Sequence, residues 1–363
     1  MAKLGDVCKK GTSNIAQKDL EGHSGIYPIY GASGFITNVD FYQQENSYIA
    51  VVKDGAGIGR IMKLPAKSSV IGTMQYIIPN DTVDISYLAF AMEHMNLSKY
   101  FTGATIPHIY FKDYQKEELS LPPLDEQRKI AAVLDKVSSL IAKRRQQLDK
   151  LDELVKAKFV EMFGDPVSNP YHWNIKGLLQ LGDCKNGMNF HSTDVGVNVH
   201  CLGVGDFKNL SRILDTSKLP TISLKDIPSD EYMLKNGDIV FVRSNGNKSL
   251  VGRSLVVYPA TIPTTFSGFC IRFRLRFDEV KADYLLQVLK TDSIRKKMAG
   301  RGANIQNLNQ KILGELQIPV PPIDLQNQFA AFVEQTEKTK TTISESLEKL
   351  ETLKKALMQE YFG

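Results

Sequence analysis

Two long segments of the chain carry apolar residues at spacings that alternate between four and three. Over residues 125–163 these positions hold Ile130, Leu134, Val137, Ile141, Arg144, Leu148, Leu151, Val155, Lys158 and Met162. In the second segment they hold Phe329, Val333, Thr336, Lys340, Ile343, Leu347, Leu350, Lys354, Leu357 and Tyr361. Such spacing is typical of the seam of a coiled coil, in which each helix buries one narrow stripe against a partner. The pattern therefore predicts two long helices that pair with each other.

The first of these helices has a recognisable start. Asp125 follows Pro122-Pro123 and is a plausible N-cap, because its side chain can accept a hydrogen bond from the first turn. A helix over 125–163 would be about 58 Å long, at about 1.5 Å per residue. That length suits a spacer between two domains.

The chain is a tandem repeat in one register. Residues 119–134 resemble residues 318–333, so that Pro122 corresponds to Pro321, and the same offset carries the Phe-Gly pair 163–164 to 362–363. It also relates 103–106 to 302–305. Fixed self-similarity of this kind indicates repeated structural units. The order is therefore domain, helix, domain, helix, with approximate twofold symmetry, and we expect the two helices to be antiparallel.

Outside the helices the pattern is that of short strands and short helices. Apolar runs over Tyr48–Val52, Asp238–Val242 and 269–276 are bounded by Gly, Asn and Pro, and helical stretches follow near 87–95 and 284–289. Similarity between the halves is looser here. Leu4-Gly5-Asp6 resembles Leu181-Gly182-Asp183, Lys53 resembles Arg243, and Gly59-Arg60 resembles Gly252-Arg253.

The predicted fold class is α+β. Two α/β domains, over 1–120 and 165–317, are joined by antiparallel coiled-coil helices over 121–164 and 318–363, as a pseudo-twofold tandem repeat. The longer of the two domains is the second one.

Composition narrows the class of protein without identifying it. The chain is 42% hydrophobic and 23% charged, has a net charge of +5, and contains neither a signal-peptide pattern nor an apolar run of membrane-spanning length. We therefore expect a cytoplasmic protein with reduced thiols. The charge is compatible with nucleic acid but dilute. Cys184, His191, His200 and Cys201 form the one conceivable metal site, and their spacing matches none of the usual patterns, so we expect no metal.

Polar, glycine-containing loops after the strands are the candidate DNA contacts. In the first domain these residues are Lys53, Arg60, Thr105, His108, Tyr110 and Lys112. In the second they are Arg243, Asn245, Asn247, Lys248, Arg301, Asn304, Gln306, Asn307 and Asn309. Arg, Asn and Gln can read base edges with paired donors and acceptors, and Lys and Arg neutralise phosphates. The alternative interpretation is that Asn and Gly simply form turns.

Several motifs raise catalytic possibilities that their context does not support. Residues 55–59 resemble a dinucleotide-binding loop but lack its spacing, and 246–249 do not fit a phosphate-binding loop. Asn169-Pro170-Tyr171 is similar to a methyltransferase motif but lies in a linker without a preceding strand. Residues 206–208 fit only superficially the metal-binding segment of a nuclease. His108 could be a general base, yet no nucleophile accompanies it.

At this point the sequence resembles a known family. Residues 121–127 (LPPLDEQ) and 159–166 (FVEMFGDP) are similar to the start and end of the conserved helical region in specificity subunits of type I restriction-modification systems. Residues 320–326 look like the second copy, with Leu325 in place of Glu. Residues 51–60 and 103–109 resemble segments of the target recognition domains of that family. The resemblance covers essentially the whole chain.

The resemblance implies a DNA-reading subunit without a catalytic site of its own. Each recognition domain would read one half of a bipartite, asymmetric site in double-stranded DNA. The paired helices, with their apolar seam residues, would fix the spacer and dock two methyltransferase subunits, and restriction subunits with motor activity would join the complex. S-adenosylmethionine, ATP and Mg²⁺ would belong to these partners, and this chain would bind no cofactor.

Two other functions stay open. The chain could be the target-recognition subunit of another restriction-methylation system of a type IIB-like kind, or a stand-alone DNA-binding protein. An autonomous methyltransferase would need a glycine-rich cofactor loop, which the sequence lacks.

Overall fold

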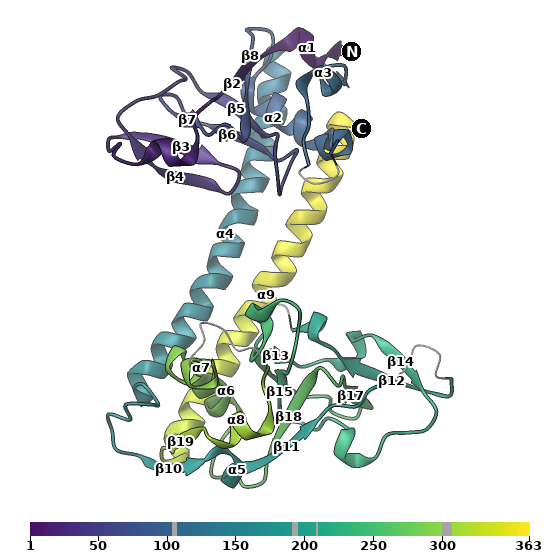
Figure 1. Ribbon diagram of the computed structural model, residues 1–363. Coiled ribbons are helices and arrows are strands. Elements are labelled where there is room, and N and C mark those ends of the chain that lie inside the picture. Colours follow the sequence, from purple (N-terminus) through teal and green to yellow (C-terminus); the bar gives the residue numbers. More distant parts are fainter. Residues whose placement is uncertain (104–106, 191–194, 208–209, 300–306) are drawn as a thin grey trace. The chain divides into compact units, whose positions relative to one another are not determined.

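The computed structural model describes residues 1–103, 107–190, 195–207, 210–299 and 307–363 (Figure 1). It divides into two compact units. The first unit combines Met1–Gln147 with Ile343–Gly363, and the second is Leu148–Thr342. The two longest helices, α4 (Leu124–Phe163) and α9 (Ile323–Phe362), each contribute to both units. Each unit has apolar cores of its own.

The first unit is built on an antiparallel four-stranded sheet. In order across the sheet its strands are β2 (Cys8–Thr12), β8 (Met74–Pro79), β5 (Tyr48–Val52) and β6 (Ile61–Leu64). The predicted strand β5 is confirmed at both ends. It is buried along its whole length, which explains why its sequence is apolar without alternation. Ile49 and Val51 face the helix α2 (Ile85–His94), whereas Tyr48, Ala50 and Val52 belong to a second cluster.

Smaller elements complete the first unit. A second sheet has the order β4 (Gly34–Val39), β3 (Tyr27–Gly31) and β7 (Ser69–Val70). The strand β1 (Ala2–Lys3) pairs with β9 (Glu118–Leu119). The short helices are α1 (Leu4–Val7), α3 (Phe111–Tyr114), η1 (Gln17–Leu20) and η2 (Leu97–Tyr100).

The second unit repeats this plan and extends it. Its main sheet has the order β11 (Gly182–Asn186), β18 (Cys270–Leu275), β15 (Asp238–Val242), β16 (Ser254–Val257) and β13 (Arg212–Ile213). The first four strands correspond to β2, β8, β5 and β6, and β13 is added in parallel to β16. The predicted strand β15 is confirmed at both ends, and β18 is shorter than the predicted 269–276 by one residue at each end.

The remaining elements of the second unit surround this sheet. A three-stranded sheet has the order β14 (Thr221–Leu224), β12 (Val197–Leu202) and β17 (Thr264–Phe266), and β10 (Asn174–Gly177) pairs with β19 (Gln317–Val320). The helices are α5 (Leu178–Leu181), α6 (Ala282–Lys290), α7 (Asp292–Ala299) and α8 (Gln310–Gly314). Single 3₁₀ turns are η3 (Val204–Asp206), η4 (Thr216–Lys218), η5 (Asp230–Tyr232) and η6 (Lys248–Leu250).

The first long helix begins earlier than predicted. It starts at Leu124, so Asp125 lies inside the first turn and is not the N-cap. The carbonyl oxygen of Pro123 accepts from the N–H groups of Glu126 and Gln127, at 2.9 and 3.0 Å. Proline is favourable at the start of a helix because its fixed φ suits the first turn. Asp125 instead lies where a negative charge interacts well with the helix dipole.

Every seam position predicted on the two long helices is buried or half-buried, including the polar residues Arg144, Lys158, Lys340 and Lys354. In the second unit Phe159 contacts Phe329, with ring centroids 5.6 Å apart. In that same unit Lys340 pairs with Asp152 at 2.7 Å, so the two helices run in opposite directions there. In the first unit an Arg145–Glu351 pair at 2.6 Å joins them, and Ile130 shares a core cluster with Met358.

The tandem repeat is confirmed by buried hydrogen bonds. Gln127 and Gln326 are both almost fully buried. The side-chain oxygen of Gln127 accepts from the N–H of Asp84, and that of Gln326 accepts from the N–H of Lys281, both at 2.8 Å. Each side-chain amide also donates to the carbonyl of the proline five residues earlier. A buried amide must have such partners, so the same network fixes each helix to its own domain.

The structure corrects one correspondence that the sequence suggested. The N–H of Leu4 donates to the carbonyl of Glu117 at 2.8 Å, and the N–H of Leu178 donates to that of Leu316 at 2.9 Å. Glu117 and Leu316 are equivalent in the repeat, so Leu4 corresponds to Leu178 and not to Leu181. Similarity over three residues identifies equivalent positions less reliably than backbone hydrogen bonding does, because Leu, Gly and Asp are common residues near the starts of strands.

Candidate nucleic-acid interface

In the first unit, two loops predicted separately as DNA contacts lie together. We call residues 53–60 and 107–112 the first loop cluster. The N–H of Gly55 donates to the carbonyl of Pro107, and the N–H of Ile109 donates to that of Lys53, both at 3.0 Å. Gly55, with a φ of +81°, allows the tight turn after β5 because it has no Cβ. Backbone pairing therefore joins segments that are about fifty residues apart.

Several predicted side chains gather in this cluster. His108 contacts the carboxylate of Asp54, which fixes the imidazole ring. The rings of His108 and Tyr110 are tilted with centroids 4.1 Å apart, and the ammonium of Lys112 lies 5.3 Å from the centroid of Tyr110. Tyr110 is nevertheless 47% exposed. An aromatic ring with the ammonium of a lysine beside it suits contacts to bases and phosphates.

Arg60 has a different environment from the other predicted residues of this cluster. Its guanidinium donates to the carbonyl of Ala32 at 2.7 Å, which ties the turn after β3 to the loop. Its backbone carbonyl accepts from Val52 at 3.0 Å. The structure therefore gives Arg60 a role in loop geometry, while its side chain stays largely exposed. Thr105 lies outside the described residues.

The second unit contains an equivalent arrangement. We call residues 243–248, 268–269 and 307–309 the second loop cluster. The N–H of Leu308 donates to the carbonyl of Arg243 at 2.9 Å, which matches the Ile109–Lys53 bond of the first unit. The N–H of Gly252 donates to Val242 at 2.9 Å, as Gly59 does to Val52. The predicted equivalence of Lys53 with Arg243, and of the two Gly-Arg pairs, is confirmed.

Three of the predicted asparagines have local structural roles. The side-chain oxygen of Asn245 accepts from the N–H of Asn247 at 2.8 Å, and that of Asn247 accepts from Ser249. Asn309 caps α8 by accepting from Ile312 at 2.9 Å. These contacts support the turn-forming alternative for each of the three carbonyl groups. Arg301, Asn304 and Gln306 lie outside the described residues.

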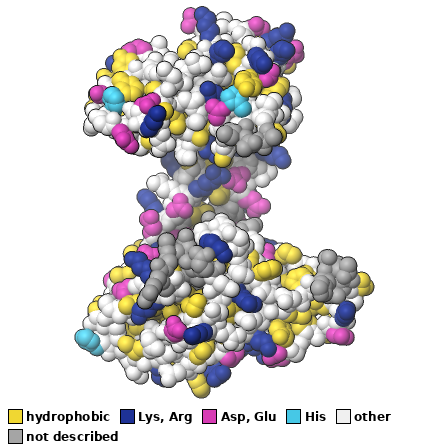
Figure 2. All heavy atoms as spheres, in the orientation of Figure 1, with side chains coloured by type: hydrophobic (Ala, Val, Ile, Leu, Met, Phe, Trp, Pro, Cys, Tyr) yellow, Lys and Arg dark blue, Asp and Glu magenta, His cyan; other side chains and the backbone are white. Residues whose placement is uncertain are grey.

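The other predicted residues of this cluster are placed at its surface. Lys248 and Asn307 are exposed, and Arg243 is half-buried with its guanidinium 3.4 Å from the carbonyl of Gly268. Figure 2 shows basic and acidic side chains interspersed on the visible face of each unit.

The structure adds one position that the sequence did not indicate. The carbonyl of Phe269 accepts from the N–H of Arg243 at 2.8 Å, and Thr73 accepts from Lys53 in the same way at 3.0 Å. Both side chains are exposed, and Phe269 is 61% exposed. The two residues precede equivalent strands, β8 and β18, so they occupy equivalent positions beside the two clusters and carry different side chains. An alignment of the strands β8 and β18 in the sequence could have identified this position.

Three of the four residues considered for a metal site lie in the described part of the chain. Cys184 lies in β11 and Cys201 in β12, which belong to different sheets. Burial raises the pKa of both thiols to about 12, so the thiolate form that binds metals is disfavoured. His200 contacts the carbonyl of Leu219 at 2.9 Å. His191 lies outside the described residues. None of the helices in the described ranges has the length and apolarity of a membrane span.

The motifs considered for catalysis also have structural roles. The glycine loop over 55–59 leads into the strand β6 and not into a helix. Asn169 closes a turn, because its side chain accepts from the N–H of Trp173 and donates to its carbonyl. Asp206 accepts from the N–H of Gly203 at 2.8 Å.

Comparison with known proteins now identifies the family. A model for the type I restriction modification DNA specificity domain matches residues 1–153 and 203–354. The chain belongs to this family. It is 24% identical to the type I restriction enzyme MjaVIII specificity subunit of Methanocaldococcus jannaschii, over 99% of this chain and 90% of that one. It is also 24% identical to the StySPI specificity subunit of Salmonella potsdam, over 72% of this chain and 59% of the relative.

Solved structures of the family share the fold. The S subunit from M. genitalium superimposes with a TM-score of 0.62 at 16% identity, over 100% of this chain and 95% of that one. A chain from a structure of assembly and conformational transition in the type I R-M system gives 0.51 at 16% identity, over 99% and 96% of the two chains. Both curated relatives named above are specificity subunits, and the mixed α/β architecture with two repeated domains is shared with the S subunit from M. genitalium.

Proposed function

We propose that this specificity subunit reads a bipartite, asymmetric site in double-stranded DNA, one half with each loop cluster. The observation that carries this proposal is the equivalence of the clusters, which follow equivalent strands and are joined by equivalent bonds, Ile109 to Lys53 and Leu308 to Arg243. Two loop clusters with equivalent backbone hydrogen bonds but different side chains are suited to recognising two different DNA sequences. Side chains at variable loop positions specify bases, and the shared frame orients them.

The two long helices are proposed to form a coiled coil that sets the spacer and docks two methyltransferase subunits. Support comes from the seam, whose predicted positions are all at least half-buried, and from the antiparallel contacts inside each unit. Exposed apolar side chains on the helices, including Val133, Leu140, Leu154 and Val160, are available for a partner. Restriction subunits would join the same complex.

The chemistry is proposed to belong to the partners. S-adenosylmethionine would be bound by the methyltransferase subunits, and ATP with Mg²⁺ by the restriction subunits. In support, the loops that resemble cofactor motifs here lead into strands and turns. We propose that this chain contributes recognition and no catalytic group.

We expect the isolated full-length chain to bind DNA weakly and to neither methylate nor cleave it. Adding the cognate methyltransferase subunit with S-adenosylmethionine should start sequence-specific methylation, because that subunit supplies the cofactor site. The measurement is transfer of a radiolabelled methyl group to plasmid DNA. Methyl transfer by the highly purified chain alone would contradict the proposal.

Arg243→Ala is expected to weaken binding of the complex to its specific site by about 1–3 kcal/mol, if the guanidinium pairs with a base edge. The matched control is Arg276→Ala. Arg243 follows Val242, which pairs with the first residue of β18, whereas Arg276 follows the last residue of β18 and pairs with Asp183 at 3.5 Å. Binding is measured on specific and random duplexes at one salt concentration. An equal loss on both duplexes would indicate a phosphate contact instead.

A further inference from the structure

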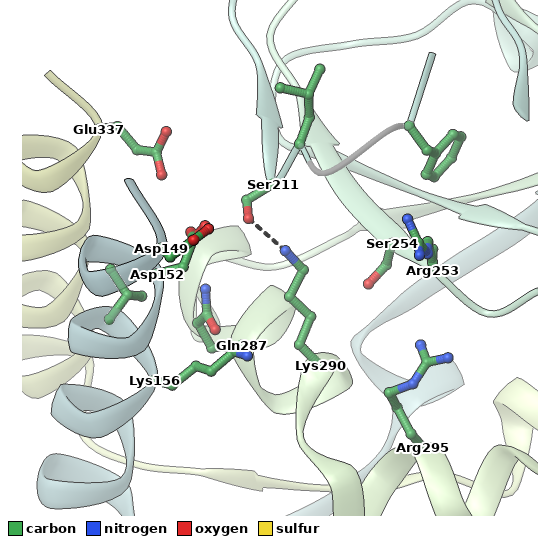
Figure 3. A pocket seen from close by; sticks show the side chains of 13 residues that line it. Asp149, Asp152, Lys156, Ser211, Arg253, Ser254, Gln287, Lys290, Arg295 and Glu337 are labelled. Atoms are coloured by element: carbon green, nitrogen blue, oxygen red, sulfur yellow. Dashed lines mark hydrogen bonds between the residues drawn. The ribbon is translucent and has the colours of Figure 1, made fainter. Parts of the chain in front are cut away.

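The second unit contains a cavity of about 390 Å³ that is separate from the second loop cluster. It lies beside α4, α6, α7 and α9 and the strand β16. Figure 3 shows Lys290, Arg253 and Arg295 with Ser254 on one side, and Asp149 and Asp152 on the other. None of the residues that line this cavity belongs to the second loop cluster, so the proposed recognition of DNA bases does not account for it.

Lys290 is the central cation of this cavity. Its ammonium donates to the hydroxyl of Ser211 at 2.6 Å, and within the described residues it makes no ion pair with a carboxylate. Burial lowers the pKa of Lys290 to about 8. Asp152 and Glu337 oppose this shift, and Lys340 and Lys156 add to it. An ammonium in this environment lacks the counter-charge that burial normally demands.

Arg295 adds a second positive charge. Its guanidinium donates to the carbonyls of Gly252 and Val251, at 3.0 and 3.4 Å. The pKa of Arg295 is lowered by burial and also by the neighbouring Arg253. Asp292 opposes this shift in part. The fold therefore brings two guanidinium groups close together, which is unfavourable unless negative charge compensates them.

The hydroxyl of Ser254 is an independent indication of a ligand. Ser254 is 4% exposed, and its Oγ has no hydrogen-bond partner in the described part of the chain. A buried hydroxyl without a partner is unfavourable by about 1–3 kcal/mol. Figure 3 places this hydroxyl at the cavity beside Lys290 and Arg253.

Two of the three carboxylates that line the cavity, Asp152 and Glu337, pair with another cation, and Asp149 is the third. The ammonium of Lys340 lies 2.7 Å from Asp152 and 3.0 Å from Glu337. These two acidic groups are therefore paired along the helices. Lys290 itself makes no ion pair with either of them in the described part of the chain.

The equivalent place in the first unit makes the difference clear. Tyr87 and Tyr284 donate to the carbonyls of residues 120 and 319, which the repeat relates, so Glu93 corresponds to Lys290. Glu93 pairs with Lys354 at 2.8 Å. The first unit has an ion pair at this place, whereas in the second unit the ammonium of Lys290 makes no ion pair within the described residues.

We propose that the cavity of the second unit binds a phosphate group between Lys290, Arg295, Arg253 and the hydroxyl of Ser254. A tetrahedral oxyanion accepts hydrogen bonds from ammonium, guanidinium and hydroxyl donors together. The volume falls in the range of small-molecule sites, about 300–1,000 Å³. The phosphate therefore comes either from a small phosphate ester or from the backbone of bound DNA.

The test is titration of the full-length chain with inorganic phosphate at constant ionic strength, followed by calorimetry and by the thermal unfolding midpoint. Phosphate should bind and raise the midpoint. Lys290→Met and Ser254→Ala should each weaken binding by about tenfold or more, because each removes one donor to the anion. Lys296→Met is the matched control, since exposed Lys296 lies on the same helix as Arg295 and outside the cavity lining.

The pH dependence of phosphate binding gives a second test, because it should follow the titration of Lys290 only if its ammonium binds the anion. Its ammonium is protonated below a pKa of about 8, so affinity for phosphate should fall as the pH rises through that region. The fall should be absent in Lys290→Met. Because Ser254→Ala keeps all charges, it reports on the site even if the lysine variant folds poorly. Equal responses of Lys296→Met and the cavity variants, or no response to phosphate, would overturn the proposal.

Competition identifies the source of the phosphate. If a short duplex of random sequence displaces phosphate, and Lys290→Met weakens binding of that duplex, the cavity holds a backbone phosphate. If phosphate and duplex bind together, the cavity holds a small phosphate ester. Both outcomes preserve the phosphate site, and neither depends on which bases the loop clusters read.

Discussion

Replacing residues 1–117 with the corresponding segment of another recognition domain is expected to change one half of the methylated motif and leave the other half unchanged. The physical reason is that the core of the first unit around β5 and α2 is separate from the core around β15 and α6. A single mismatched base pair already costs about 1–3 kcal/mol. Loss of all base contacts to one half-site should therefore abolish methylation of the original motif.

The exchange is read out by sequencing the methylated positions in host DNA. Exchange of 165–317 is the reciprocal control, and it should alter the opposite half of the motif. The exchanged segment must supply a backbone N–H at the position of Asp84, because the side-chain oxygen of Gln127 accepts a hydrogen bond from that group. A simultaneous change in both half-sites would show that the two units do not read independently.

Adding one heptad to each long helix, after Gln147 and after Ser346, is expected to lengthen the spacer of the methylated motif by one to three base pairs. Seven residues preserve the seam and add about 10 Å, at about 1.5 Å per residue. At about 3.4 Å per base pair this corresponds to roughly three base pairs. Both insertions lie near the boundaries between the compact units, so the cores are not altered.

Rotation limits this shift. Three base pairs turn the DNA by roughly 100°, since about ten make a full turn. One heptad turns a supercoil with a pitch of about 150 Å by only about 25°. The recognition domains or the DNA must absorb the difference, so we also expect weaker binding.

The control for the heptad variant is seven residues inserted at Gly22. This glycine lies in an exposed turn of the first unit with open space around it. The motif and spacer should then stay unchanged. Full activity of the heptad variant with an unaltered spacer would show that the helices do not set the distance.

The sequence alone determined those features that rest on repeated local patterns. The alternating spacing of four and three located the first helix, predicted over 125–163, to within one residue, because burial of a narrow stripe requires that spacing. The second helix begins at Ile323, five residues after the predicted 318, because residues 317–320 form the strand β19. The apolar runs of β5 and β15 were located at both ends, since a strand buried on both faces excludes polar residues. The fixed register of the repeat also indicated that Lys53 and Arg243 are equivalent.

Tertiary structure alone decided which loops meet. Gly55 contacts Pro107, and Arg243 contacts Leu308, through backbone groups whose pairing carries no sequence signature. For the same reason the position of Phe269 and Thr73 was missed. Asn309 was predicted to contact DNA because an amide side chain can pair with a base edge, but its side-chain oxygen caps the helix α8. The surroundings of Lys290 also depend on α4, α7 and α9, which only the packed fold brings to α6. Local composition specifies what a segment can form, and long-range packing determines which of its groups are left to bind another molecule.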